Sequence, residues 1–123
     1  MNNVVGQHII LDVHNCKSKN MLTDVDTIRA VLVSAAIQAR ATVVTDTLHS
    51  FGVDGGVTGV IVLAESHISI HTWPEHKYAA VDIFMCGDKC NPIKAAEVIT
   101  NNLNGYGRLT AVHERGFPKE YTL

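Results

Sequence analysis

The sequence predicts an α+β fold, a two-layer sandwich in which two helices cover one face of a mainly antiparallel sheet. Three observations favour it: two segments have apolar residues at helical spacing, about six short segments have strand-like patterns, and 123 residues suit one domain, 1–123. Two helices leave the other face of the sheet uncovered. We therefore expect that face to pack against the sheet of a second copy, giving an α/β/β/α homodimer.

The N-terminal half is expected to contain a strand, a helix and another strand. Residues 7–13 (QHIILDV) are apolar and partly alternating, which indicates a strand. Thr23 and Asp26 resemble a capping box, and the apolar residues after them recur every three or four positions, so an amphipathic helix is expected over 24–40. Residues 42–47 are rich in Thr and Val, which is typical of a strand.

The C-terminal half is expected to contain four strands and one helix. A strand at 57–64 follows a glycine-rich loop. Residues 66–72 and 79–86 each alternate between apolar and polar side chains, so we expect two half-buried strands that form a hairpin. An Asn-Pro pair opens a helix over 91–104, because Asn caps a helix well and Pro suits its first position. Residues 107–115 form the last predicted strand.

Composition and charge exclude several classes of protein. Ten Lys and Arg against twelve Asp and Glu give a formal charge of −2, which offers no basic surface for nucleic acid. The longest apolar run, 60–64, is far shorter than the roughly 20 residues of a membrane helix, and the polar N-terminus is no signal peptide. The protein is therefore expected to be cytoplasmic and to bind neither nucleic acid nor membrane.

Cysteines and histidines are not arranged as metal or disulfide sites. Three cysteines are too few for a disulfide framework, so free thiols in a reducing compartment are expected. His67 and His71 lie about 13 Å apart along one strand and cannot share a metal ion. No metal site is therefore predicted.

Reactive side chains are concentrated in residues 65–87. If the hairpin turn spans 74–78, Ser66 lies directly opposite Cys86, with Cβ atoms about 5 Å apart. His71 then lies about 16 Å from Ser66 along the strand and on its other face. A site that uses all three side chains therefore needs a second chain to supply the histidine.

Motifs extend over nearly the whole chain. The longest is AESHISIHTWPE at 64–75, followed by AAVDIF and CG; others are a GxH near the N-terminus (Gly6, His8), the stretch from Leu48 to Phe51, GVTG at 56–59 and ERG at 114–116. Together these motifs closely resemble the prokaryotic-type S-adenosylmethionine decarboxylases, a family of pyruvoyl enzymes in polyamine synthesis.

The resemblance implies that the chain cuts itself between Glu65 and Ser66. In this family the serine hydroxyl attacks the preceding carbonyl to form an ester, β-elimination opens the ester, and hydrolysis leaves a covalent pyruvoyl group. The products would be a beta chain, 1–65, and an alpha chain, 66–123, whose first residue is the cofactor. Thr58 and His71 match the residues that assist this processing, the histidine as the base for the elimination.

The resemblance also implies how catalysis would proceed. The substrate amine condenses with the pyruvoyl carbonyl to form a Schiff base, and the conjugated carbonyl accepts the electrons that carbon dioxide leaves behind. Cys86 matches the proton donor, Glu75 the acid that holds ribose hydroxyls, and Phe51 and Trp73 the aromatic residues near adenine or sulfonium. The implied activity is decarboxylation of S-adenosylmethionine, which makes the aminopropyl donor for spermidine, at two sites shared between the chains of a homodimer.

Three alternatives remain open at this point. The same scaffold occurs in relatives that decarboxylate arginine or ornithine, and Glu75 would suit a cationic side chain equally well. The chain could also be an unprocessed, non-catalytic homologue that acts as a binding or regulatory subunit, because an intact bond between Glu65 and Ser66 leaves no electrophile. A metal-binding protein built on the seven histidines is a weaker alternative.

Overall fold

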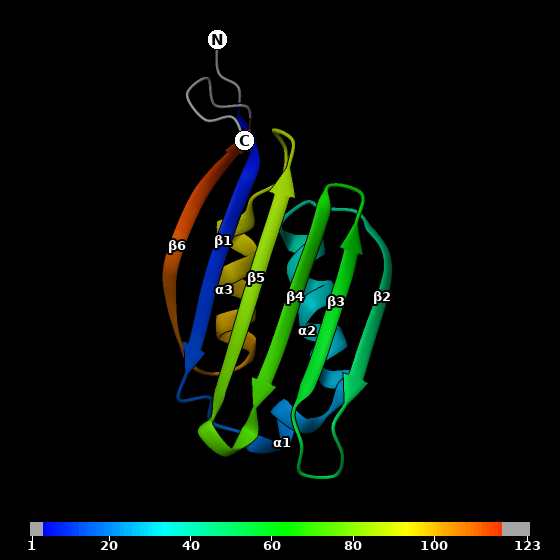
Figure 1. The fold of residues 1–123 in the computed structure, drawn as a ribbon, viewed down its shortest axis with the longest axis vertical. Helices are drawn as coiled ribbons and strands as arrows, with labels where there is room; N and C mark the ends of the chain where they lie inside the picture. The colour runs from blue at the N-terminus through cyan, green and yellow to red at the C-terminus, as the bar shows by residue number, and fades with distance from the viewer. Residues whose placement is uncertain (1–3, 117–123) are drawn as a thin grey trace, which may run out of the picture.

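A single antiparallel sheet of six strands, in the order β2-β3-β4-β5-β1-β6, forms the centre of the computed structural model, which describes residues 4–116 (Figure 1). The strands are β1 (Val4–His14), β2 (Val43–Ser50), β3 (Val57–Leu63), β4 (Ser66–Trp73), β5 (Tyr78–Cys86) and β6 (Tyr106–Gly116). The helices are α1 (Lys19–Thr23), α2 (Val25–Gln38) and α3 (Pro92–Asn102), with a 3₁₀ turn, η1, at Pro74–His76. Every predicted strand and both predicted helices are present, with ends that shift by a few residues.

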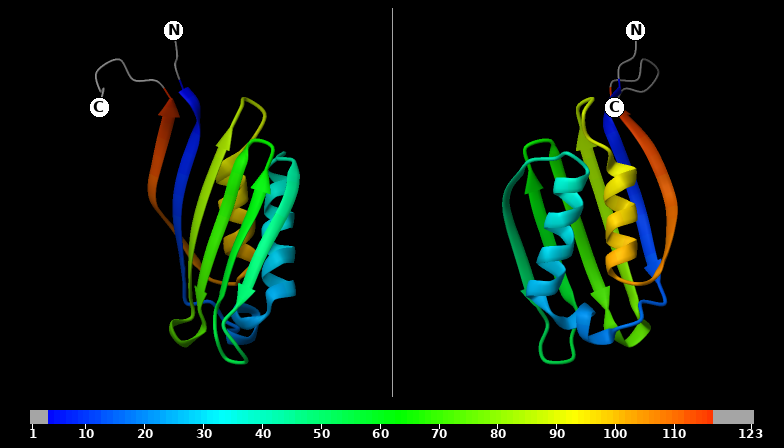
Figure 2. Two further views of the ribbon diagram at one scale, coloured as in Figure 1. Left: turned by 45° about the vertical axis from the view of Figure 1, so that its right-hand side comes forward. Right: turned by 180° about the vertical axis from the view of Figure 1, so that it is seen from behind.

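The helices form the second layer. Seen from behind in Figure 2, α2 and α3 run side by side across one face of the sheet. The predicted fold class, a mainly antiparallel sheet with helices on one face, is therefore confirmed. No helix of residues 4–116 combines the length and the hydropathy that crossing a membrane requires.

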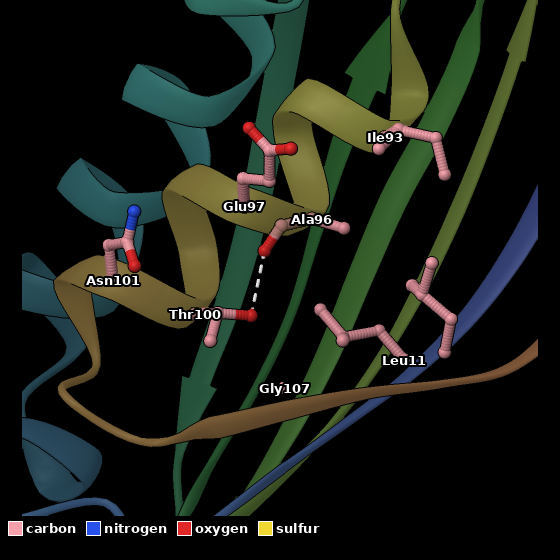
Figure 3. A pocket seen from close by; sticks show the side chains of 8 residues that line it. Leu11, Ile93, Ala96, Glu97, Thr100, Asn101 and Gly107 are labelled. Atoms are coloured by element: carbon pink, nitrogen blue, oxygen red, sulfur yellow. Dashed lines mark hydrogen bonds between the residues drawn. The ribbon is translucent and has the colours of Figure 1, made fainter.

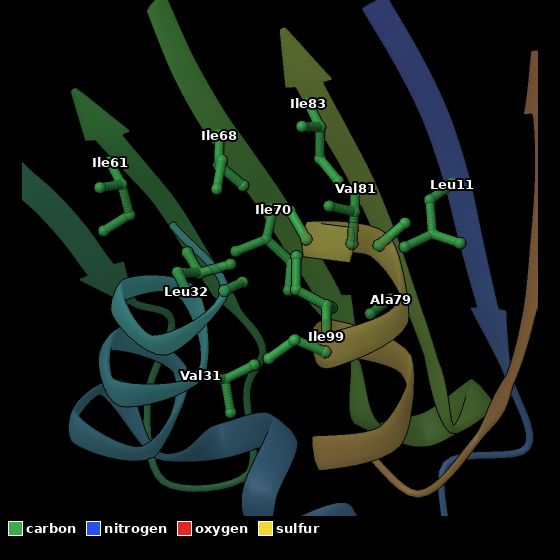
Figure 4. Packing of buried hydrophobic residues seen from close by; sticks show 14 of the residues in the cluster. Leu11, Val31, Leu32, Ile61, Ile68, Ile70, Ala79, Val81, Ile83 and Ile99 are labelled. Atoms are coloured by element: carbon green, nitrogen blue, oxygen red, sulfur yellow. The ribbon is translucent and has the colours of Figure 1, made fainter. Parts of the chain in front are cut away.

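The apolar core lies between the sheet and the helices. Ile68 and Ile70 of β4 and Ile83 of β5 point toward Leu32 of α2 and Ile99 of α3, and each of the five is at most 3% exposed (Figure 4). Burying side chains of this size stabilises the fold by about 1.5–3 kcal/mol each. The period-two pattern of β4 and β5 therefore decides which of their faces meets the helices.

A short helix precedes α2 where the sequence predicts none. The Ser18 hydroxyl caps α1 by accepting a hydrogen bond from the Met21 backbone N–H at 3.3 Å. The predicted capping box at Thr23 and Asp26 is wrong, because Thr23 ends α1 and Asp24 is the residue that precedes α2. Five residues are too few to produce a periodic apolar signal, so the pattern starts only with α2.

The hairpin of β4 and β5 differs from the prediction by one residue. Trp73 pairs with Tyr78, so the connection spans only residues 74–77, and Ser66 pairs with Met85 rather than with Cys86. The connection is short because η1 is followed at once by a residue in the left-handed conformation, which turns the chain back into β5. The predicted pairing of Ser66 with Cys86 is therefore wrong.

The face of the sheet opposite α2 and α3, here called the open face, carries the polar residues of the central strands. Two of its apolar side chains, Ile10 and Val62, are each 39% exposed. The other residues of the open face include His8 and Asp12 of β1, Thr58 and Val60 of β3, His67, Ser69, His71 and Trp73 of β4, and Ala80, Asp82, Phe84 and Cys86 of β5.

Candidate active site

The predicted cleavage point lies at the tight turn between β3 and β4. Leu63 pairs with Ser66, so Ala64 and Glu65 form a two-residue turn. Ser66 has a φ of +150°, a backbone conformation that residues with a side chain adopt only under strain, at a cost on the order of 1–3 kcal/mol. The peptide bond between Glu65 and Ser66 is therefore attached to a strained residue.

Two donors of Cys86 converge on the carbonyl oxygen of Glu65. The Cys86 backbone N–H donates over 3.0 Å and its thiol over 2.7 Å. Cys86 thus lies against the carbonyl group of the bond that cleavage would break, although it does not face Ser66 directly. Donors placed in this way polarise a carbonyl and stabilise the negative charge that develops on its oxygen during nucleophilic attack.

The Glu65 side chain anchors the same turn to the segment before β2. Its carboxylate accepts hydrogen bonds from the Thr42 backbone N–H at 2.8 Å and from the Thr42 hydroxyl at 3.2 Å, and Lys89 Nζ lies 3.8 Å away. The bond from the Thr42 backbone N–H is the main cause that lowers the pKa of Glu65 below its ordinary value. The carboxylate is therefore ionised at neutral pH and fixes the turn.

Ser66 also has a neighbour for which the sequence predicts no role. Its hydroxyl oxygen lies 3.0 Å from Nδ1 of His67, and Nε2 of His67 lies 3.4 Å from Oδ2 of Asp82. Asp82 Oδ1 is hydrogen-bonded to Nε2 of His8 at 2.7 Å. The alternation of β4 and β5 could have suggested only that His67 and Asp82 lie on the polar sides of their strands, because the contact with His8 depends on β1 lying beside β5.

Other predicted site residues gather at the opposite end of the sheet. The Thr58 hydroxyl is hydrogen-bonded to Nδ1 of His71 at 2.5 Å. The ring centroids of Phe51 and Trp73 lie 5.7 and 4.2 Å from that of His71. Glu75 lies in η1 at the same end and is exposed. We call these five residues the aromatic cluster, and Glu65, Ser66 and Cys86 the turn cluster.

The two clusters do not meet within one chain. In Figure 1 the turn between β3 and β4 is at the top of the sheet, whereas η1 and the loop between β2 and β3 are at the bottom. His71 follows Ser66 by five residues on the same strand, which corresponds to about 16 Å. The separation expected for Ser66 and His71 is therefore present in the structure.

A row of rings continues from the aromatic cluster across the open face. Trp73 stacks on Tyr78, with ring centroids 5.2 Å apart, and Tyr78 stacks on His14 at 5.0 Å. The Tyr78 hydroxyl donates a hydrogen bond to Asp12 at 2.5 Å, and this bond is the main cause that raises the pKa of Tyr78 to about 12. The lower end of the open face is thus a continuous aromatic surface.

A cavity of about 300 Å³ lies on the other side of the sheet, between α3 and β6 (Figure 3). None of the predicted site residues lines it. Its lining residues are Leu11, Ile93, Ala96, Glu97, Thr100, Asn101, Gly107 and Leu109. Within residues 4–116, no group of three or more His, Cys, Asp or Glu is placed to hold a metal ion.

Comparison of the sequence with known proteins gives one consistent result. The sequence profile of the S-adenosylmethionine decarboxylase family matches residues 7–116. A protein of Thermotoga petrophila named S-adenosylmethionine decarboxylase proenzyme is 41% identical over 112 residues, which are 91% of this chain and 85% of the relative. A protein of the same name from Caldanaerobacter subterraneus is 42% identical over 114 residues, 93% of this chain and 90% of the relative.

The fold gives the same result. The crystal structure of the adenosylmethionine decarboxylase from Aquifex aeolicus superposes with a TM-score of 0.85, is 36% identical in sequence, and covers 99% of both chains. The likeness therefore includes the central strands that carry both clusters.

Proposed function

The chain belongs to the S-adenosylmethionine decarboxylase family, and on that premise we propose that it is a self-processing, pyruvoyl-dependent decarboxylase of S-adenosylmethionine. Its product would be the aminopropyl donor for spermidine. The three cysteines are free thiols, which supports a cytoplasmic location, where thiols stay reduced. None of the relatives named above is an arginine or ornithine decarboxylase.

One observation carries the proposal: a strained serine follows a carbonyl group that already accepts two hydrogen bonds. The positive φ of Ser66 raises the energy of the intact chain, and both donors of Cys86 point at the Glu65 oxygen. Attack of the Ser66 hydroxyl on that carbonyl would relieve the strain and place negative charge on the oxygen that Cys86 contacts. Ester formation and β-elimination would then yield chains 1–65 and 66–123.

The residues around position 66 fit a pyruvoyl group. Bound there, the group would supply a carbonyl that condenses with the substrate amine and accepts the electrons released on decarboxylation. The Cys86 thiol, which lies against the carbonyl that precedes residue 66, is in reach to return a proton to the substrate carbon. Thr58 and His71 assist processing in this proposal, with His71 as the base for the elimination.

A complete site requires two copies of the chain, because the clusters lie at opposite ends of the sheet. If two open faces pack together about a two-fold axis, the turn cluster of one chain meets the aromatic cluster of the other. The exposed Ile10 and Val62 on this face support such a contact, since burying them would remove apolar surface from water. We propose a homodimer with two such shared sites.

The aromatic cluster suits the substrate chemically. The rings of Phe51 and Trp73 both lie close to that of His71, where they would stack on adenine and attract the sulfonium cation. The carboxylate of Glu75 is a bidentate acceptor for a pair of ribose hydroxyls. We propose these three residues as the substrate-binding residues, with no metal ion in the site.

Denaturing mass spectrometry tests processing. The purified chain should separate into 1–65 and 66–123, the second with a pyruvoyl-blocked amino terminus, and Ser66→Ala should remain one intact chain with no decarboxylase activity. Carbon dioxide release from S-adenosylmethionine, arginine and ornithine then tests the substrate. An intact wild-type chain after long incubation, or release from arginine or ornithine instead, would contradict the proposal.

Chain mixing tests the shared site. His71→Ala and Cys86→Ala chains, each strongly impaired alone, should regain part of the wild-type activity after joint refolding, because every mixed dimer holds one complete site. Differently tagged chains report how much subunit exchange has occurred. Exchange without recovery would show that His71 and Cys86 act within one chain.

A further inference from the structure

We propose that His67 is the base that takes the proton from the Ser66 hydroxyl in the first step of self-processing, and that Asp82, His8 and Arg115 hold His67 in the competent state. The proposal rests on the proposed function, because it assigns a residue to the step that forms the ester. It is carried by a chain of contacts that runs from Ser66 across four strands of the open face.

His67 presents an acceptor to the reacting oxygen. Its Nδ1 lies 3.0 Å from Ser66 Oγ, which is hydrogen-bond distance for a base to remove a proton. Its Nε2 lies 3.4 Å from the Asp82 carboxylate. The negative charge of that carboxylate favours a proton on Nε2 over a lone pair there. His67 is therefore favoured in the tautomer whose Nδ1 is free to accept the Ser66 proton.

Arg115 and His8 fix the carboxylate that orients His67. A guanidinium has only donors, so the contact of Arg115 with Nδ1 of His8 at 3.0 Å makes that nitrogen the acceptor. The proton of neutral His8 then lies on Nε2, which donates to Asp82 Oδ1 at 2.7 Å. Asp82 is thus held by one histidine while its second oxygen faces the other.

One aromatic ring packs this group together. The centroid of Phe84 lies 5.4 Å from that of His8, in a stacked arrangement, and 6.1 Å from that of His67, edge to face. The guanidinium carbon of Arg115 lies 5.2 Å from the same centroid. The ring therefore limits the orientations open to both histidines and to the arginine.

An ordinary surface ion pair would explain only part of this arrangement. The side chains of His67, Asp82 and His8 are 40%, 34% and 21% exposed, and pairs so accessible to water contribute little to stability. An ion pair would not require the remaining nitrogen of His67 to face the nucleophile. That contact with Ser66 Oγ is what points to a chemical role.

The step balances without any further reactant. The bond between Ser66 Oγ and the Glu65 carbonyl carbon forms as the hydroxyl proton moves to His67 Nδ1. The bond between that carbon and the Ser66 nitrogen then breaks, and the proton moves from His67 to the leaving nitrogen. An ester and a free amine replace the peptide bond, and His67 is again neutral. His71 would act only afterwards, in the elimination.

Hydroxylamine separates the two steps, because it cleaves esters much faster than amides. A His71→Ala chain should form the ester and stop, so hydroxylamine should release 1–65 as a hydroxamate and 66–123 with an amino-terminal serine. A His67→Ala chain should form the ester far more slowly, so most of it should keep the peptide bond and resist hydroxylamine. The double variant should behave like His67→Ala. We expect His67→Ala to form the ester more slowly by about 10²-fold or more, a typical loss for a general base.

Further variants distinguish chemistry from folding. His113→Ala, an exposed histidine on β6, is the matched control and should process like the wild type. Added imidazole should restore part of the ester formation in His67→Ala, which a merely structural defect would not allow. Asp82→Asn keeps His67 in place but removes the charge behind it, so it should slow ester formation by a smaller factor, with unchanged circular dichroism.

Each outcome decides between the two proposals. If the wild type processes and His67→Ala forms the ester at the wild-type rate, the role of His67 is wrong and the proposed function stands. If His67→Ala accumulates a hydroxylamine-sensitive ester, His67 acts later than proposed, which also overturns the inference. If the wild type itself never processes, the proposed function fails instead.

Discussion

Replacing Cys86 by alanine should slow self-processing as well as catalysis, because it removes one of the two donors on the Glu65 carbonyl. The backbone N–H, at 3.0 Å, remains in the variant, and only the thiol at 2.7 Å is lost. Loss of one donor to a developing oxyanion typically costs 10²- to 10³-fold in rate. A thiol is a weak donor, so we expect roughly 10- to 100-fold, or about 1.4–2.7 kcal/mol in the activation barrier.

The measurement is the time course of cleavage in freshly synthesised protein. Chains made by a short pulse of cell-free translation are sampled over time, and denaturing mass spectrometry gives the ratio of intact chain to fragment 66–123. Cys86→Ser is the matched control because its hydroxyl also donates. It should be cleaved at a rate near that of the wild type, yet decarboxylate slowly, since a hydroxyl is a far weaker acid than a thiol. Wild-type cleavage in Cys86→Ala would refute the reasoning.

Three further predictions concern stability and titration. Ser66→Gly should be more stable than Ser66→Ala by roughly 1 kcal/mol in thermal melts, because relief of the positive-φ strain exceeds the entropy cost of glycine; the reverse order would contradict the strain. In an uncut Ser66→Ala chain, the lowered pKa of Glu65 contributes stability that is present above its ordinary value of 4.5 and is lost as the pH falls through the folded value. Denaturant titrations at a series of acid pH values measure the free energy of unfolding. Glu65→Gln should make that free energy depend less on pH in this range. The raised pKa of Tyr78 predicts stability that is present below pH 10 and lost as the pH rises through about 12. Ultraviolet titration should show a phenol with a pKa of about 12. Asp12→Asn should lower that pKa toward 10.

The elements of the fold were predictable because their apolar patterns are regular. Alternation in 66–72 and 79–86 gave two strands and their buried faces correctly, and the spacing of apolar residues gave α2 and α3. Register was less predictable because it was taken from an assumed turn length. The apolar pattern itself excludes the predicted register, since Ile68 must share a face with Ile83, and a slip of one residue would place them on opposite faces.

The candidate site was predictable to the extent that it lies in one continuous motif. Strand geometry predicted the distance between Ser66 and His71, whereas the roles of these residues and the second chain are proposals. Ser66, His71 and Cys86 could be named as candidates from the motif and its family resemblance. The group behind His67 could not, because it joins residues that are distant in sequence: His8 and Asp82 are 74 positions apart and meet only because β1 enters the sheet beside β5. Such a contact depends on strand order, which local patterns do not determine.

The order of the strands has a consequence for the two chains that the proposed cleavage would produce. The piece that ends at Glu65 provides β1, β2 and β3, and the other provides β4, β5 and β6, but β1 lies between β5 and β6. The strands of the two pieces are thus interleaved in a single sheet, and in neither piece alone are all three strands adjacent to one another. After cleavage, unfolding would release two separate polypeptides that must collide to reassemble. Recovery from denaturant should then fall on dilution, whereas an uncut chain refolds independently of its concentration.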